Sequence, residues 1–285
     1  MKYSYYPGCT LYNKAKEFDI STRKSCETLG INLVELPHWY CCGAAYPQSQ
    51  DHKIPLIAPF RVLAKAKLEG NDLITLCSFC YHVLKRVNYS INEDEEKKDL
   101  MNDFLDENYQ GDQRVVHLLE VLRDDLGFER ILEFKKQDLS SLKVAPYYGC
   151  YLLRPENEIG IDNHENPMIL NDLLSTLGIE VVDSPLKVEC CGSYLVLVNK
   201  EATLAAVARI LDGYKKLGAE AITTTCPLCH YNLDRFQEDL KLKGFKPIPI
   251  FYFTQLLALY LGADGVEFRA NRVPVEPYLK EKGII

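Results

Sequence analysis

Two motifs of the chain, Cys41-Cys42-Gly43 and Cys77-Ser78-Phe79-Cys80, occur a second time. Their second copies are Cys190-Cys191-Gly192 and Cys226-Pro227-Leu228-Cys229, with every cysteine displaced by 149 positions. A Gly-Cys pair precedes each stretch. Ten of the eleven cysteines therefore fall into two groups with the same order. The first cysteine set is Cys9, Cys41, Cys42, Cys77 and Cys80, and the second cysteine set is Cys150, Cys190, Cys191, Cys226 and Cys229. A repeat of this length indicates a duplicated domain.

The residues around the cysteines repeat as well. Thr28-Leu-Gly-Ile31 matches Thr176-Leu-Gly-Ile179, at a separation of 148 positions. Cys9 and Cys150 are only 141 positions apart, because the loop that follows the Gly-Cys pair is longer in the second copy. Length differences of this kind fall in loops. We therefore predict two domains, residues 1–140 and residues 141–285, each with one cysteine set.

Each copy has the same expected order of strands and helices. Short apolar runs predict strands that lead to the cysteine motifs, and segments stopped by Gly30 or Gly178 predict helices. The expected strands are 3–6, 72–76, 144–148 and 221–225, and the expected helices include 17–29 and 167–177. Alternation of this type is typical of an α/β fold with a parallel sheet. We predict two duplicated Rossmann-like halves whose cysteines converge at the carboxyl ends of the strands.

Composition excludes several classes of protein. The chain of 285 residues is 47% hydrophobic and 26% charged, as globular proteins are, and its formal charge of -7 disfavours a nucleic-acid surface. Residues 1–8 lack the basic and apolar regions of a secretory signal, so we expect a cytoplasmic protein with reduced thiols. The apolar stretch 251–263 is shorter than the roughly 20 residues that span a bilayer. We therefore expect no direct membrane span, and any membrane link to run through a partner.

Reduced cysteines in this number indicate metal or redox chemistry. A structural zinc site takes four thiolates, and a thioredoxin-type dithiol takes two, so five per copy exceed both. Iron–sulfur clusters commonly take four thiolates, and a fifth would bridge two irons or leave one iron open to a sulfur ligand. Gly43 and Gly192 allow the sharp turn with which a Cys-Cys-Gly loop would wrap around such a cluster.

These motifs resemble the tandem Cys-Cys-Gly domain family, and most closely the family of heterodisulfide reductase B subunits. The resemblance runs from Gly8-Cys9 to Cys229 and the final helix, and both copies carry the full five-cysteine pattern. It implies that each cysteine set binds one noncubane four-iron four-sulfur cluster. It also implies reduction of a disulfide, of the CoM-S-S-CoB type or a related one, to two thiols between the two clusters.

The same resemblance implies partner subunits. One is a ferredoxin-like iron–sulfur subunit, of the C type, and the other a flavin-containing subunit, of the A type, which can perform electron bifurcation. The chain has no Gly-x-Gly-x-x-Gly after a predicted strand, so we expect its electrons to come from another chain. The alternative function is an electron-transfer module that acts on a quinone, a coenzyme or a protein partner.

Other residues near the motifs are secondary candidates. His82 and His230 follow the Cys-x-x-Cys pairs and are the predicted catalytic residues, as donors to sulfur or to a leaving thiolate. His38 is a weaker candidate, and Cys26 is expected to be a buried apolar residue. Candidates for receiving an anionic group of a substrate are Lys14, Lys16, Arg154 and Lys187, and tyrosines expected to wall the site are Tyr6, Tyr46, Tyr148 and Tyr194.

Overall fold

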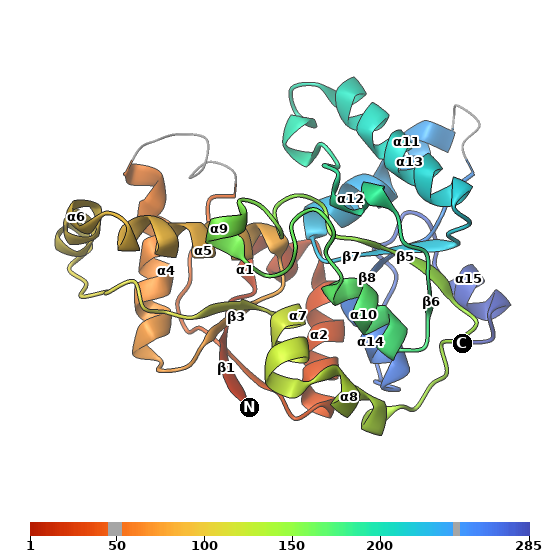
Figure 1. Cartoon of the computed structure of the whole chain (residues 1–285), viewed down its shortest axis with the longest axis horizontal. Helices are drawn as coiled ribbons and strands as arrows, with labels where there is room; N and C mark the ends of the chain where they lie inside the picture. The colour runs from red at the N-terminus through yellow and green to blue at the C-terminus, as the bar shows by residue number, and fades with distance from the viewer. Residues whose placement is uncertain (45–52, 242–245) are drawn as a thin grey trace.

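The computed structural model describes residues 1–44, 53–241 and 246–285, and its core is built on two four-stranded parallel sheets (Figure 1). The sheets have equivalent strand orders, β2-β1-β3-β4 and β6-β5-β7-β8. The strands are β1 Lys2–Tyr5, β2 Asn32–Glu35, β3 Leu73–Thr75, β4 Val115–His117, β5 Lys143–Tyr147, β6 Glu180–Val181, β7 Ala221–Thr224 and β8 Ile250–Tyr252. The predicted α/β class with duplicated parallel halves is confirmed.

Helices connect the strands and bury one apolar face each. In α11, for example, Val207, Ile210, Leu211 and Tyr214 are buried at spacings of three and four residues. The α-helices are α1 Gly8–Asn13, α2 Lys16–Thr28, α4 Ile57–Leu68, α5 Ser78–Asn92, α6 Glu95–Leu105, α7 Leu118–Glu120, α8 Phe128–Ile131, α9 Glu156–Ile159, α10 Ile169–Thr176, α11 Lys200–Lys216, α12 Pro227–Arg235, α13 Gln237–Lys241, α14 Phe253–Tyr260 and α15 Glu276–Glu281. Shorter 3-10 turns are η1 Ile54–Leu56, η3 Leu132–Phe134, η4 Pro185–Val188 and η5 Ser193–Leu195, and η2 Val121–Leu126 is a π-helix.

The fourth strand of each sheet was missing from the sequence prediction. The apolar runs that contain β4 and β8 continue directly into α7 and α14, so they look like the start of a helix. His117 and Tyr252 mark the switch, because each is the last residue of its strand and the residue before its helix. A strand of three residues inside a longer apolar run leaves no separate period to detect.

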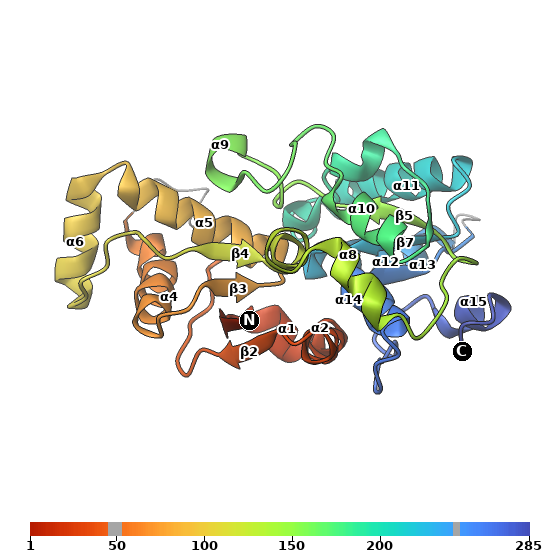
Figure 2. The ribbon, with the colours of Figure 1, turned by 60° about the horizontal axis from the view of Figure 1, so that its bottom comes forward.

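The two halves pack against each other through helices from both copies. α2 and α14 lie side by side in both views of the ribbon (Figures 1 and 2). Ser21 Oγ and Thr254 Oγ1 are 2.7 Å apart, and the ring of Phe18 stacks on the ring of Tyr252 with their centroids 4.3 Å apart. Since these groups are buried, the contact joins the two cores. The domain boundary near residue 140 stays a prediction.

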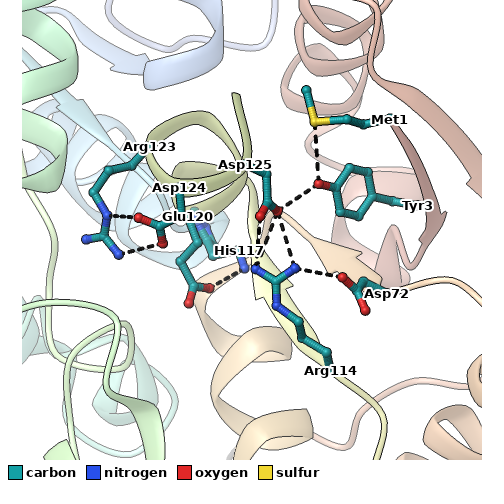
Figure 3. A network of polar contacts seen from close by, with 9 residues as sticks. All are labelled: Met1, Tyr3, Asp72, Arg114, His117, Glu120, Arg123, Asp124 and Asp125. Carbon is teal, nitrogen blue, oxygen red and sulfur yellow. Dashed lines mark hydrogen bonds and ion pairs between the residues drawn. The ribbon is translucent and has the colours of Figure 1, made fainter. Parts of the chain in front are cut away.

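The amino ends of the first sheet's strands carry a network of charges (Figure 3). Arg114, just before β4, donates to Asp72 at 2.7 Å and to Asp125 at 3.3 Å. The Tyr3 hydroxyl, from β1, donates to the same Asp125 carboxylate at 2.7 Å. The network links three strands at the edge opposite to the cysteines, and therefore contributes to the fold rather than to the site.

Among the helices in the described parts of the chain, none combines the length and the apolar character that crossing a membrane requires.

Candidate functional site

The cysteines lie beyond the carboxyl ends of the parallel strands, as predicted. Cys9 is the second residue of α1, which follows β1. Cys77 and Cys226 are the residues that precede α5 and α12, and their backbone is extended, so the chain turns from strand to helix at each of them. Parallel strands end at a common edge, and this edge brings residues that are distant in sequence into one crevice.

The sulfur atoms have the same arrangement in both copies. Cys9 Sγ lies 3.7 Å from Cys41 Sγ, and Cys150 Sγ lies 3.7 Å from Cys190 Sγ. The second thiol of each Cys-Cys pair lies 3.6 Å from the last thiol of the Cys-x-x-Cys motif in the same copy. These pairs are Cys42 with Cys80 and Cys191 with Cys229. The duplication visible in the sequence is therefore also a duplication of sulfur geometry.

Glycines let the backbone approach these sulfurs. A Cβ placed on Gly8 would lie 2.9 Å from Cys80 Sγ, and one on Gly149 would lie 3.0 Å from Cys229 Sγ. Both glycines have a φ of 70°, which side-chain-bearing residues rarely adopt. Gly43 and Gly192, also at positive φ, donate their backbone N–H groups to Cys41 and Cys190 at 3.5 and 3.3 Å. The Gly-Cys and Cys-Cys-Gly motifs thus share one purpose, close approach of backbone to sulfur.

A tyrosine in each copy fixes the Cys-Cys loop. The Tyr6 hydroxyl donates to the carbonyl of Tyr40 at 2.7 Å, and the Tyr147 hydroxyl donates to the carbonyl of Glu189 at 2.6 Å. Each acceptor is the residue before a Cys-Cys pair. Tyr6 was predicted as a wall of the site, whereas Tyr147 was missed, although the displacement of 141 positions from Tyr6 marks it in the sequence.

The two cysteine sets meet. The thiols of Cys77 and Cys226 lie close enough to shift each other's pKa in opposite directions, and both are buried. Beside them, Ser78 Oγ and Thr225 Oγ1 are 2.9 Å apart. Nothing in the spacing of the motifs predicted this junction, because the repeat specifies each copy and not their relative placement.

Contacts among the thiols pull their pKa values apart. The pKa of Cys190 is lowered to about 6, first by the hydrogen bond from Cys150 and then by the N–H of Gly192, against the effect of burial. The pKa of Cys150 is raised by the same contact and by burial. Thiolate is the form that binds metal, so the site stabilises part of its sulfur in the form a metal needs.

A model of the cysteine-rich domain family named CCG matches residues 3–85 and, a second time, residues 144–234. The chain belongs to the CCG cysteine-rich domain family. Its two CCG copies contain all ten cysteines of the two sets.

Relatives that align with nearly the whole chain include subunits of two kinds of reductase. The 8-methylmenaquinol:fumarate reductase membrane anchor subunit of Wolinella succinogenes is 34% identical, with 95% of this chain and 95% of that protein covered. The B subunit of the ferredoxin/F(420)H(2)-dependent CoB-CoM heterodisulfide reductase of Methanosarcina acetivorans is 31% identical, with 92% and 89% covered. A protein of Archaeoglobus profundus that is named as similar to the heterodisulfide reductase B subunit is 30% identical, with 93% and 92% covered. The predicted resemblance is confirmed.

The fold has a match among solved structures. A hypothetical protein from Helicobacter pylori superposes on 93% of this chain with a TM-score of 0.71 and 15% identity. The chain spans about half the length of that structure, 49%. At this identity the match shows the shared fold alone.

The longer loop of the second CCG copy covers one side of the site. Cys150 lies 40 positions before Cys190, whereas Cys9 lies 32 before Cys41. The added segment includes α9, which packs on α5 through Arg86 and Glu158, whose atoms Nε and Oε2 are 2.6 Å apart (Figure 1). Tyr151 stands at the position of Thr10, and its ring centroid lies 3.9 Å from that of Phe79. Copy two therefore closes over copy one on this side.

The two predicted catalytic histidines face backbone carbonyls. His82 Nδ1 lies 3.0 Å from the Tyr151 carbonyl, and His230 Nε2 lies 3.2 Å from the Ile250 carbonyl. Burial lowers the pKa of each histidine to about 4, so both are neutral at pH 7 and have one N–H to donate. These contacts support a positioning role, and the catalytic role of both residues stays a prediction.

The opposite side of the junction is open. A cavity of about 610 Å³ lies between α1 of the first copy and α12 of the second, and we call it the α1–α12 cavity. Its walls include Thr10, Lys14, Tyr231, Arg235 and Arg272, together with the carboxylates of Glu17 and Asp234. The cavity thus carries three cations against two carboxylates.

The other candidates divide by exposure. Lys14 lines the α1–α12 cavity and forms no ion pair with the described part of the chain, which fits its predicted role. Lys187 is 2% exposed and lies 2.9 Å from Asp183, so its ammonium group is not available for a substrate anion. Lys16, Arg154 and His38 are exposed. Cys26 is buried, and burial raises its pKa to about 12, which confirms the predicted apolar role.

The remaining tyrosines have ordinary structural roles or lie outside the described residues. Tyr148 is buried and donates to Asn171 Oδ1 at 2.8 Å, whereas Tyr194 is exposed. Tyr46 belongs to the stretch 45–52, which is outside the described residues.

Proposed function

We propose that this chain is the iron–sulfur subunit of a multi-subunit reductase that reduces a small disulfide to two thiols. The first and second cysteine sets each hold one noncubane four-iron four-sulfur cluster. The observation that carries the proposal is the junction of the two equivalent thiol sets, where Ser78 Oγ and Thr225 Oγ1, each next to a cysteine of its set, are 2.9 Å apart. Two adjacent electron carriers suit a two-electron reaction, because an iron–sulfur cluster transfers one electron at a time.

The residues of the site fit such a group. The donors are thiols alone, five in each set, and sulfur is the ligand that iron–sulfur clusters take from protein. A side chain at Gly8 or Gly149 would fill the space against a sulfur, and the backbone N–H groups of Gly43 and Gly192 donate to sulfurs. Among the described side chains, no group of three His, Cys, Asp or Glu is arranged around a single metal ion, so a mononuclear zinc site has no preformed geometry here.

The reaction consumes one disulfide, two electrons and two protons, and yields two thiols. The clusters, when bound, would supply the electrons and an iron atom to which each released sulfur can bind. The chain holds the clusters through its cysteines, and Tyr6 and Tyr147 fix the Cys-Cys loops. Lys14 and Arg272 of the α1–α12 cavity suit an anionic group on the disulfide, whereas Arg235 is paired with Glu238.

Partners follow from the same proposal. Electrons arrive from a ferredoxin-like subunit, and a flavin-containing subunit completes the complex and can support electron bifurcation. The relatives named as heterodisulfide reductase B subunits support this assignment. A cytoplasmic location stays a prediction.

A second candidate function is an electron relay to a quinone, a coenzyme or another protein. The Wolinella relative supports it, since that protein is named as a subunit of a menaquinol:fumarate reductase. In this case the clusters would be fully ligated, and small thiols would not bind them.

An electron-resonance experiment separates the two functions. Coenzyme thiols are added one at a time to the oxidised, cluster-loaded protein, alone and with its ferredoxin-like partner. A thiol that binds iron shifts the cluster signal, and a thiol labelled with a magnetic sulfur nucleus broadens it. If no thiol changes the signal while the complex passes electrons through these clusters, the relay function replaces disulfide reduction.

A further inference from the structure

One buried side chain distinguishes the second cysteine set from the first. Asn232, in α12, is 1% exposed, and its amide nitrogen Nδ2 lies 3.0 Å from the Cys191 carbonyl and 3.7 Å from Cys191 Sγ. An amide NH₂ group has two N–H donors. The amide group of Asn232 therefore donates to both the carbonyl and the sulfur of one residue, a predicted ligand.

Among the described residues of the first copy, no side-chain amide donates to the sulfur of Cys42. The residue 149 positions before Asn232 is Val83, which lies in α5, is 1% exposed and has no polar atom to donate. The sulfurs themselves are placed alike, since Cys42 is as far from Cys80 as Cys191 is from Cys229, 3.6 Å. Among the described residues, the sulfurs of Cys42 and Cys191 thus have matching distances to their partner thiols, and only Cys191 has a side-chain amide as a hydrogen-bond donor.

The sulfur in the first copy depends on its other neighbours. Cys42 Sγ lies 3.6 Å from Cys80 Sγ, and the backbone N–H of Ala44 donates to it. A backbone donor is supplied by any residue type, so among the described residues the sequence difference at this sulfur is Asn232 against Val83.

A hydrogen bond to sulfur favours the reduced form of an iron–sulfur group. Reduction adds one electron, and part of the added negative charge resides on the ligand sulfurs, so a donor stabilises the reduced form more than the oxidised form. The effect is strong where water is excluded, and both Asn232 and Cys191 are buried.

We infer that Asn232 raises the reduction potential of the iron–sulfur group held by the second cysteine set. The side chain makes the second site a better electron acceptor than the same site would be with valine. The inference rests on the proposal that the cysteine sets hold iron–sulfur groups, and it does not depend on which substrate receives the electrons.

The experiment is a redox titration of the full-length, cluster-loaded chain, with mediators and electron-resonance detection. Three variants are compared with the natural chain. Asn232→Val installs the residue of the first copy, Asn232→Leu keeps the volume without a donor, and Val83→Asn introduces an amide at the equivalent position of the first copy. Iron and acid-labile sulfide are measured in every sample.

We expect both Asn232 variants to lower one of the two midpoint potentials and to leave the other unchanged. The expected change in the reduction equilibrium is on the order of tenfold, which is about 59 mV for a one-electron couple. Val83→Asn should raise the other midpoint. In ordinary buffer the natural chain should show the coupling of one exchangeable proton to the cluster signal, which deuterated buffer removes, and both Asn232 variants should lack it, a loss that a purely structural role would not cause.

Unchanged midpoints in Asn232→Val and Asn232→Leu at full iron content would overturn the inference. If these variants lose iron, the Val83→Asn variant tests the inference instead. An unchanged midpoint potential of the cluster held by the first cysteine set would then overturn it. A natural chain that binds no iron and sulfide would instead overturn the proposed function, a result visible before any variant is made.

Discussion

The first and second CCG copies have nearly the same sulfur geometry in different surroundings. The corresponding sulfur pairs, Cys9 with Cys41 and Cys150 with Cys190, have equal separations of 3.7 Å. Cys9 and Cys41 are nevertheless exposed, whereas Cys150 and Cys190 are half-buried. The difference teaches that the duplicated fold sets the geometry of the ligands, while access to them depends on loops that the two copies do not share.

The longer loop of the second copy accounts for much of this asymmetry. Its helix α9 packs on α5, and Tyr151 fills the space beside Phe79. On the other side of the junction the equivalent residue is Thr10, which leaves the α1–α12 cavity open. The junction between the two cysteine sets is thus closed by α9 on one side and open to the α1–α12 cavity on the other.

The largest expected effect comes from removing a ligand from one copy. We expect about eight irons and eight sulfides in the natural chain, and about four of each in Cys41→Ser and in Cys190→Ser, since each half is predicted to fold around its own site. Metal and sulfide analysis with electron resonance measures this. Cys26→Ser is the control and should keep the full content.

Loss of both clusters in either variant would contradict the independence of the copies. It would mean that the contact between Cys77 and Cys226 joins the sets into one shared site. Zinc in place of iron would end the iron–sulfur interpretation altogether.

The open cavity can be made to resemble the closed side. The variant Thr10→Tyr carries the residue that the second copy has at position 151. We expect the tyrosine to fill the α1–α12 cavity and to weaken the binding of a small anionic thiol by at least about tenfold, because a filled cavity excludes its ligand. The thiol-induced shift of the cluster signal measures binding, and iron content should not change. Thr10→Ser, which keeps a small side chain, is the control. Equal thiol binding in Thr10→Tyr would show that the ligand enters elsewhere.

A difference in acid stability is expected from His117, whose counterpart is Tyr252. His117 Nδ1 accepts the N–H of Leu119 at 3.2 Å, and burial lowers the pKa of His117 to about 4 from 6.5. The folded chain therefore favours the neutral ring, whereas the unfolded chain binds a proton at His117 below pH 6.5. The contribution of His117 to the free energy of unfolding is complete above pH 6.5 and is lost as the pH falls toward 4. At about 1.4 kcal/mol per pKa unit, the full loss is on the order of 3 kcal/mol.

Urea unfolding at several pH values between 7 and 4 tests this expectation. His117→Gln should lose less stability over this interval than the natural chain, since glutamine does not titrate. His82 and His230 still titrate in the variant, so part of the pH dependence remains. If the free energy of unfolding falls equally with pH in both proteins, His117 does not cause the acid sensitivity.

The smallest effect is expected at the edge opposite to the cysteines, where only the first copy has an arginine. Pro249 precedes β8 at the position that Arg114 occupies before β4. We expect Arg114→Ala to lower the free energy of unfolding by about 1 kcal/mol, because it breaks partly exposed contacts to Asp72 and Asp125. Lys24→Ala, which breaks one exposed pair with Glu27, is the control and should cost less. A change in iron content of Arg114→Ala would contradict the separation of this network from the site.

Most of the fold was predictable because the motifs mark strand ends. Glycines and cysteines gave the ends of β1, β3, β5 and β7 to within about one residue, and α2 and α10 to within about two, as is usual for element boundaries. β4 and β8 were missed, since three apolar residues that run into an apolar helix have no periodicity of their own. Tyr147 was within reach of the sequence, since it repeats Tyr6 at the displacement of its own Gly-Cys pair.

The sequence by itself determined the two cysteine sets, their α/β scaffold and their thiol chemistry, because the order of residues along each copy specifies its strands and turns. Only the tertiary structure decided that Cys77 meets Cys226, that α9 closes one side of the junction and that Asn232 reaches Cys191. These contacts join segments far apart in the chain or in different copies. They depend on how helices and loops pack in space, and a linear pattern contains no record of that packing until the chain has folded.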